Sequence, residues 1–272
     1  MAKKGQAWQD LLDRAEDALA DGHHREAALL CDRAALAGDD ARYFAALLKG
    51  DVLLDLGEVE AALSSYDSVA EPGVEDPEID CARGVALFEL ARFAEADKAL
   101  RSALRGNPKL AEAHHTLGLI AEILGTGHDV DCFRQARRLD PQRFPPVAQL
   151  SRAQFETVVH EALADLPAPV AKAVGDVPVL VAEVPHQSDL TQADPPLSPR
   201  ILGLFVGAAP PQVSVLDAPA EVQPTIFLFK RNLERACKDL ATLRAEIRMT
   251  VLHEVGHALG LSEGELEAMG LE

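Results

Sequence analysis

Basic residues are scarce in this sequence. Lys and Arg total 26 against 44 Asp and Glu, which gives a formal net charge of −18 at pH 7. Nucleic acids and anionic membranes attract surfaces that are rich in Lys and Arg. The charge balance therefore argues against both as partners, and we expect a peptide or protein partner instead.

Long apolar segments are missing as well. The sequence has no run of 18 apolar residues, the minimum for a membrane-spanning helix. Its first stretch, MAKKGQAWQDLLDRAEDAL, has no apolar core because acidic residues interrupt it, so we expect no secretory signal. These absences predict a cytoplasmic protein.

Cysteines are few and widely spaced. The four cysteines, which form no CxxC pair, are Cys31, Cys81, Cys132 and Cys237. This spacing argues against a disulfide framework and against a zinc site built from thiolates. We interpret these residues as free, buried thiols in a reducing cytoplasm.

A repeat occupies the first half of the chain. Two series of small residues recur every 34 positions: Gly50, Gly84 and Gly118, and Ala28, Ala62, Ala96 and Val130. Such a period predicts one pair of antiparallel helices per repeat, with small residues where two helices cross closely. In the last repeat Phe133 stands one place early relative to Leu100, which implies a one-residue deletion.

The unit ARGVALFELARFAEADKALRSALRGNP resembles a tetratricopeptide repeat (TPR), and the resemblance covers about residues 8–142. Gly84 and Ala96 stand at the small positions of that pattern, and Pro108 closes the unit. Asp80 stands where the pattern often has Trp. A TPR-like solenoid either only supports its neighbouring domain or binds a peptide or partner in a groove, and both roles remain open.

The repeat pattern ends at three prolines, Pro141, Pro145 and Pro146, which stop helical continuation. We therefore predict a TPR-like domain at residues 1–145 and a second domain at residues 146–272.

The second domain mixes helix and strand signals. The segment SRAQFETVVHEALADLP predicts a helix with Ser151 as its cap. Three short apolar runs predict strands at 177–184, 201–207 and 225–230, and the Pro-rich segments between them are expected to be loops or sheet edges. A periodic stripe predicts a long helix over 238–260. The predicted fold class is an α-helical repeat followed by a small α+β domain.

The stretch TVLHEVGHALGLSEGE, residues 250–265, contains the pattern HExxH. His253 and His257 are four apart, so on a helix their imidazoles project from the same face. Two imidazole nitrogens can then bind one Zn²⁺ ion at about 2.0–2.1 Å. Glu254 occupies the general-base position of zinc peptidases. We predict a zinc site with His253 and His257 as ligands and Glu254 as the catalytic residue.

The third zinc ligand is predicted from the residues that come after the motif. Only residues 258–272 come after His257, too few for the distant second-helix Glu of the thermolysin-like arrangement. In the arrangement HExxHxxGxxH the chain turns at a Gly, here Gly260, and the third ligand position falls at Glu263. A carboxylate is an acceptable zinc ligand, so we predict Glu263, with Glu265 as the alternative. Ordinary capping of a short helix after Ser262 is the competing interpretation for both.

Four segments of the second domain together resemble the minimal zincin-like metallopeptidase family of bacteria: QFETVVHEALADLP, ILGLFVG, TIFLFKRNLERAC and EIRMTVLHEVGHALGLSEGELEAMG. The resemblance spans about residues 151–272. It implies a small zincin-like α+β domain in which His253, His257 and the acidic Glu263 bind zinc and Glu254 is the catalytic acid and base. The fused repeat domain departs from the shortest members of that family.

The predicted function is zinc-dependent hydrolysis of peptide bonds, with the TPR-like domain recruiting a partner or substrate. Zinc would activate water and polarise the scissile carbonyl, while Glu254 would pass the proton to the leaving amine. Both tyrosines, Tyr43 and Tyr66, lie in the repeat domain, so no Tyr of the second domain can stabilise the oxyanion.

Two alternatives remain open. The run ILGLFVG either presents a strand edge to an extended peptide or is a plain core strand. The whole chain is either a peptidase or a non-catalytic, metal-stabilised interaction module. The intact Glu254 favours the peptidase, because a purely structural zinc site needs no acid or base at that position.

Overall fold

The computed structural model describes residues 3–70, 73–207 and 223–268. The chain divides into two compact units. Unit 1 comprises Met1–Pro145 together with Gln187–Pro199, and unit 2 comprises Pro146–His186 together with Arg200–Glu272. Unit 1 therefore includes one segment from beyond the predicted domain border. Within the described ranges, no helix has both the length and the apolar character needed to cross a membrane.

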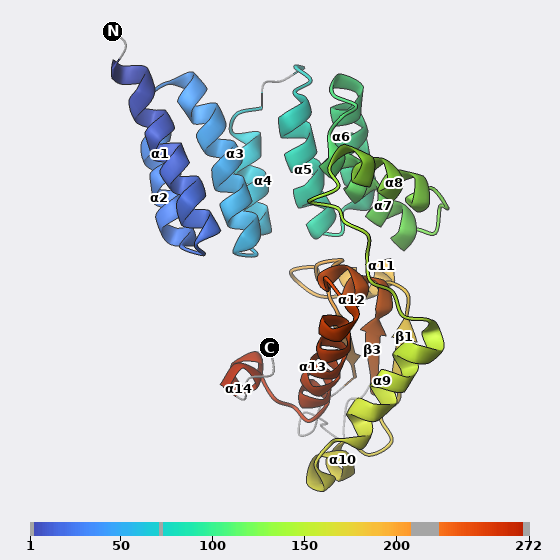
Figure 1. Cartoon of the computed structure of the whole chain (residues 1–272). Coiled ribbons are helices and arrows are strands. Elements are labelled where there is room, and N and C mark those ends of the chain that lie inside the picture. The colour runs from blue at the N-terminus through green and yellow to red at the C-terminus, as the bar shows by residue number, and fades with distance from the viewer. Residues whose placement is uncertain (1–2, 71–72, 208–222, 269–272) are drawn as a thin grey trace. The chain divides into compact units, whose positions relative to one another are not determined.

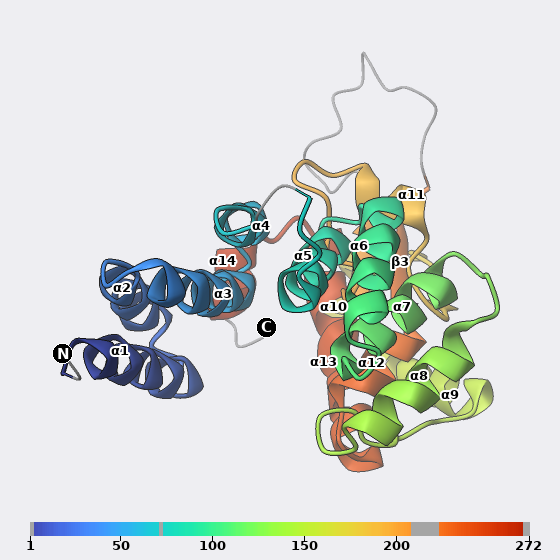
Figure 2. The same cartoon turned by 90° about the horizontal axis from the view of Figure 1, so that it is seen from above.

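Unit 1 is a row of helix pairs, seen from two directions in Figures 1 and 2. Its helices are α1 (Lys3–Ala20), α2 (His24–Ala35), α3 (Asp39–Asp55), α4 (Val59–Asp67), α5 (Pro77–Glu89), α6 (Phe93–Gly106), α7 (Ala111–Ile123), α8 (Asp129–Leu139) and the short α11 (Gln187–Thr191). Each of α1, α3, α5 and α7 packs on the helix that comes next in the chain, and these first helices also contact one another along the row. The predicted helical repeat is confirmed.

Close crossings explain the periodic glycines. A Cβ atom on Gly84 would lie 2.5 Å from Cγ of Leu100, and one on Gly118 would lie 2.7 Å from Cε1 of Phe133. Gly50 faces the buried Tyr66 in the same way. Only a residue without a side chain allows the two helices of a pair to approach this closely. Phe133 occupies the place that Leu100 has in the preceding repeat, but it stands one position earlier in the sequence, as the predicted one-residue deletion requires.

Unit 2 is built on a three-stranded sheet in the order β1-β3-β2. Its strands are β1 (Val179–Ala182), β2 (Gly203–Val206) and β3 (Thr225–Phe229). The central β3 pairs in parallel with β1 and antiparallel with β2, where Gly203 lies opposite Leu228. The helices of this unit are α9 (Arg152–Ala164), α10 (Ala168–Val174), α12 (Lys230–Ala236), α13 (Leu240–Ala258) and α14 (Glu263–Ala268).

The core of unit 2 lies between the sheet and the helices α9 and α13, which pack side by side (Figure 1). Phe155 and Val158 of α9 and Ile226 of β3 are all fully buried in it. Ser151 begins α9 with a capping box, in which its hydroxyl accepts from the amide of Gln154 and the Gln154 side chain accepts from the Ser151 amide.

The three predicted strands and the long predicted helix are confirmed in this α+β unit, each slightly shorter than predicted. The first Pro-rich segment, which was predicted to be a loop or a sheet edge, contains a short helix instead. Residues 187–191 form α11, because Leu190 on this otherwise polar turn is completely buried and anchors it. Most of the second Pro-rich segment, residues 208–222, lies outside the described residues.

Candidate metal centre

Helix α13 carries both histidines of the motif. It is capped at its start by Asp239, whose side chain accepts a hydrogen bond of 2.8 Å from the amide of Thr242. The stripe that faces the core is formed by residues four positions apart, none more than 2% exposed: Leu243, Ile247, Val251 and Val255. This burial fixes the rotation of the helix and therefore the direction in which His253 and His257 project.

The helix ends in a Schellman motif. Gly260 has a φ of 84°, its amide donates to the carbonyl of His257 at 2.9 Å, and the amide of Leu261 donates to the carbonyl of Gly256 at 3.0 Å. A left-handed residue is required here, and Gly adopts that conformation without strain. The chain consequently reverses directly after the second histidine, as the motif predicted.

The two imidazoles converge. Nε2 of His253 and Nε2 of His257 are 3.0 Å apart, and the ring centroids are separated by 4.6 Å. Two nitrogen ligands of a tetrahedral zinc ion at about 2.0–2.1 Å from the metal are themselves about 3.3 Å apart. The two nitrogens are thus close to the separation that one ion needs, and both rings are half-buried.

The turn at Gly260 also orients His257. Its Nδ1 lies 3.3 Å from the carbonyl oxygen of Leu261. With the proton on Nδ1, the ring donates this hydrogen bond and presents the lone pair of Nε2 toward His253. A hydrogen bond from the non-binding nitrogen is the usual way in which proteins fix a metal-binding histidine. The donor set therefore fits zinc.

Glu254 lies on a different face of α13 from the two histidines and packs against the sheet. Its side chain is only 5% exposed. Gly203, the first residue of β2, is so close that a Cβ atom there would stand 2.6 Å from Oε1 of Glu254 and 2.9 Å from Cγ2 of Thr250. Strand β2 therefore runs directly past the carboxylate, and a glycine at this position makes room for it.

Helix α14 carries the predicted third ligand. Glu263 is its first residue, and its side chain lies outside the described part of the structure. Leu266 of α14 is fully buried against α13, where a Cβ atom on Gly256 would collide with it. Gly256 thus allows α14 to dock on the turn of α13 that separates the two histidines. Among the described side chains, no group of three potential metal ligands is assembled.

Glu265, the alternative ligand, is engaged elsewhere. Its Oε2 accepts hydrogen bonds from the amide of Ser262 at 2.8 Å and from the Ser262 hydroxyl at 2.7 Å. The amide hydrogen bond, and after it the hydroxyl one, holds the pKa of Glu265 below its ordinary value. This is the reciprocal half of a capping box, so the capping interpretation describes Glu265 well.

Gly203 and Leu266 were not singled out by the sequence. A glycine in a strand signals a bulge or a close approach of another group, but it does not say which group approaches. The partner of Gly203 lies 51 positions away, and only the packing of α13 on β2 brings the two residues together.

The geometry agrees with a comparison against known protein families. Residues 174–271 match the model of a family described as zincin-like metallopeptidase. The match contains all three strands as well as α13 and α14. The resemblance predicted from the sequence is therefore confirmed for this part of the chain, which is a peptidase-like domain fused to a helical repeat. No curated protein matches the sequence.

The helical repeats are similar to solved TPR structures. One is a thermophilic TPR protein in Thermus thermophilus, with 23% identity, a TM-score of 0.46, and coverage of 61% of this chain and 90% of that one. A second is YrrB, described as a TPR protein with an unusual peptide-binding site, with 19% identity, a TM-score of 0.38, and coverage of 51% and 71%. A third is MamA, with 18% identity, a TM-score of 0.41, and coverage of 59% and 81%.

Proposed function

We propose that this chain is a zinc-dependent peptidase and that its repeat unit recruits a peptide or protein. His253, His257 and Glu263 hold the ion, and Glu254 is the catalytic acid and base. One observation carries the proposal. The two imidazole Nε2 atoms converge to 3.0 Å on a helix whose intervening glutamate is buried against a neighbouring strand.

Zinc, when bound, supplies a Lewis acid that activates water and polarises the carbonyl of the scissile bond. The carboxylate of Glu254 accepts a proton from the attacking water and returns it to the leaving amine. Its 5% exposure keeps bulk water away from this carboxylate, and the contact with Gly203 restricts where the side chain can lie. Leu261 contributes through its carbonyl, which fixes the ring of His257.

The substrate peptide binds along β2. Within the described residues, β2 pairs on one side only, with β3, so its other edge offers backbone donors and acceptors. An extended peptide adds to such an edge by main-chain hydrogen bonds. Because Gly203 begins this strand beside Glu254, a peptide paired with β2 is held next to the catalytic carboxylate.

A cytoplasmic location is part of the proposal. All four cysteines are free, and Cys31, Cys81 and Cys237 are buried. Burial raises the pKa of Cys31 to about 11 and that of Cys81 to about 12, which keeps both as thiols at neutral pH. Unpaired, protonated thiols fit a reducing compartment.

The test is Glu254→Gln in the full chain. Zinc content is measured by elemental analysis, and hydrolysis is monitored with a fluorogenic, unstructured protein substrate. The variant should retain its zinc and lose at least about 100-fold of the hydrolysis rate. Glu246→Gln, two turns earlier on α13, is the matched control and should behave as wild type. Undiminished hydrolysis in zinc-loaded Glu254→Gln would remove Glu254 from the mechanism.

A further inference from the structure

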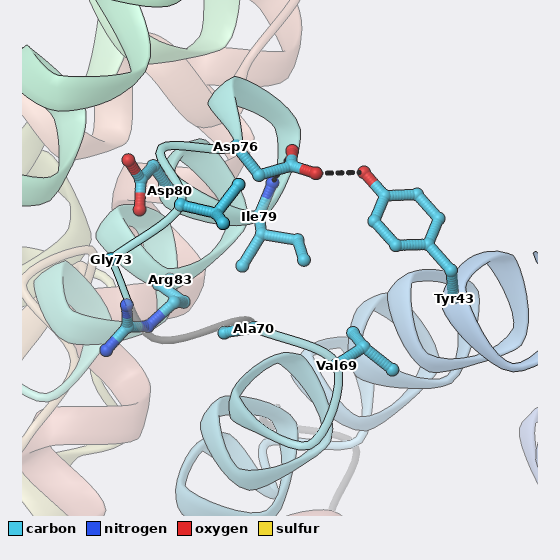
Figure 3. Close-up of a pocket in the computed structure, with 9 residues that line it drawn as sticks. Tyr43, Val69, Ala70, Gly73, Asp76, Ile79, Asp80 and Arg83 are labelled. Atoms are coloured by element: carbon cyan, nitrogen blue, oxygen red, sulfur yellow. Dashed lines mark hydrogen bonds between the residues drawn. The ribbon is translucent and has the colours of Figure 1, made fainter. Parts of the chain in front are cut away.

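Unit 1 contains a cavity of about 490 Å³ between α3, the described residues of the connector after α4, and α5. In Figure 3, Tyr43 approaches from α3 on one side, and Asp76, Ile79 and Asp80 come from α5 and its cap on the other. Val69 adds an apolar wall from the connector. The volume lies within the range of about 300–1,000 Å³ that is typical of small-ligand sites.

The helix that precedes this cavity, α4, is shorter than its counterpart in the next repeat. In the next repeat, α6 has 14 residues and continues to Gly106, which packs closely on Pro77 at the start of α5. Helix α4 starts at Val59, one period of 34 residues before the start of α6, but it has only nine residues and ends at Asp67. The last turn that would cover the adjoining ends of α3 and α5 is therefore absent from α4.

The cavity wall is negatively charged. Asp76 caps α5, because its Oδ1 accepts from the amides of Glu78 and Ile79 at 3.0 and 3.1 Å. Its Oδ2 accepts a hydrogen bond of 2.9 Å from the hydroxyl of Tyr43. Partial burial, and then this bond to Asp76, raise the pKa of Tyr43, so the phenol remains a neutral donor.

Asp80 brings a second carboxylate to the wall. It is half-buried, and its carboxylate makes no hydrogen bond or ion pair with any residue that the structure describes. Among the described residues that line the cavity, Arg83 is the one cation. It forms an ion pair of 2.7 Å with Asp67. The charge of Arg83 is therefore already paired with Asp67, which does not line the cavity, and among the described residues no cation pairs with the carboxylate of Asp80.

Aromatic side chains continue from the cavity along the first helices of the repeats. Tyr43 packs edge to face with Phe44 at 5.2 Å, and Phe44 stacks on Trp8 of α1 at 5.9 Å. Phe44 is 47% exposed, in a chain in which only 4% of residues are aromatic. Val74 at the rim of the cavity is 60% exposed. Exposed aromatic surface next to a pocket is typical of a protein-binding site.

We propose that this cavity binds a Lys or Arg side chain of a partner peptide and that Phe44 packs against an apolar neighbour in that peptide. The aliphatic stem of the basic residue lies along Val69, Ile79 and the ring of Tyr43, and its cationic end pairs with Asp80. Asp76 adds a second negative charge. The proposal goes beyond the peptidase and is independent of catalysis.

The test measures binding in the full chain carrying Glu254→Gln, so that no peptide is cleaved. Pools of fluorescently labelled octapeptides, random except for one central residue fixed as Arg, Lys, Glu or Ala, are titrated by fluorescence polarisation. The Arg and Lys pools should bind about tenfold more tightly than the Ala and Glu pools, because a partly desolvated charge pair favours the matching partner. Equal binding of all four pools would overturn the proposal.

Two variants assign the preference to Asp80. Asp80→Asn should remove the preference for basic residues, whereas Asp129→Asn should retain it. Asp129 is the matched control because it lies half-buried in the first turn of α8, away from the cavity. Asp80→Lys should reverse the preference toward the Glu pool, a gain that misfolding cannot produce. An undiminished preference in Asp80→Asn and Asp80→Lys would place the basic residue elsewhere.

Discussion

Gly203 and Glu254 belong to separate elements of the peptidase-like domain and meet in direct contact. A Cβ atom on Gly203 would lie 2.6 Å from Oε1 and 2.8 Å from Cγ of Glu254. The two residues bring an edge strand and the catalytic glutamate of the proposed mechanism together. A side chain at position 203 must therefore displace either the strand or the carboxylate.

Gly203→Ala should lower the hydrolysis rate by about 10- to 100-fold, because a catalytic group displaced by a fraction of an ångström loses its alignment. Zinc content should stay at the wild-type level, since the atoms nearest to the added methyl group belong to Glu254 and Thr250 and not to a histidine. Rate and zinc content are measured on the same preparation. A variant that hydrolyses at the wild-type rate would show that this contact does not position Glu254.

Gly256→Ala should weaken zinc binding by about tenfold or more. The added methyl group collides with Leu266 and pushes α14 away from the histidines, and displaced ligand supports typically cost 10- to 100-fold in metal affinity. Affinity is measured by competition with a chromogenic chelator. Gly264→Ala is the control, since open space surrounds Gly264, and it should bind zinc as wild type does. Equal losses in both variants would contradict the docking role of Gly256.

Glu263→Ala and Glu265→Ala should separate the two candidate third ligands. Glu263→Ala should lose most of its zinc, because two imidazoles alone leave the ion without its third protein ligand. Glu265→Ala should retain its zinc and lose only about 0.5–2 kcal/mol of stability, the usual value of a helix cap. Elemental analysis and thermal unfolding are the measurements. Zinc loss in Glu265→Ala alone would reverse the assignment.

Thiol reactivity should depend on burial. With pKa values of about 11 and 12, Cys31 and Cys81 carry far less thiolate at pH 8 than an ordinary thiol of pKa near 8.5. Alkylation by iodoacetamide should therefore be at least about 100-fold slower at both cysteines than in the urea-unfolded chain, and it should speed up as the pH rises toward 11. Mass spectrometry of the modified peptides measures each rate. Equal rates in the native and unfolded chains would contradict the buried assignment.

Much of the repeat unit was predictable, because its geometry is local. Gly84 must be small where α5 crosses α6, and Leu100 lies within the same helix pair, so the sequence spacing alone encodes the contact. The turn at Gly260 was predictable for the same reason. His253 and His257 share one helix, and their convergence results from helical geometry.

Long-range packing was not predictable in this way. Neither the approach of Gly203 to Glu254 nor the docking of Leu266 on Gly256 leaves a periodic signal, because both depend on how separate elements pack. The cavity near Tyr43 could not be predicted from the sequence either. The 34-residue period continues through it without change, while the helix at that point ends early at Asp67.

The most direct test of the zinc peptidase is metal analysis of the purified full chain together with hydrolysis before and after chelation. We expect about one zinc ion per chain in the wild type, none in His253→Ala, and hydrolysis that disappears on chelation and returns when zinc is added back. A wild-type chain that purifies without metal and does not take up added zinc would contradict the zinc site.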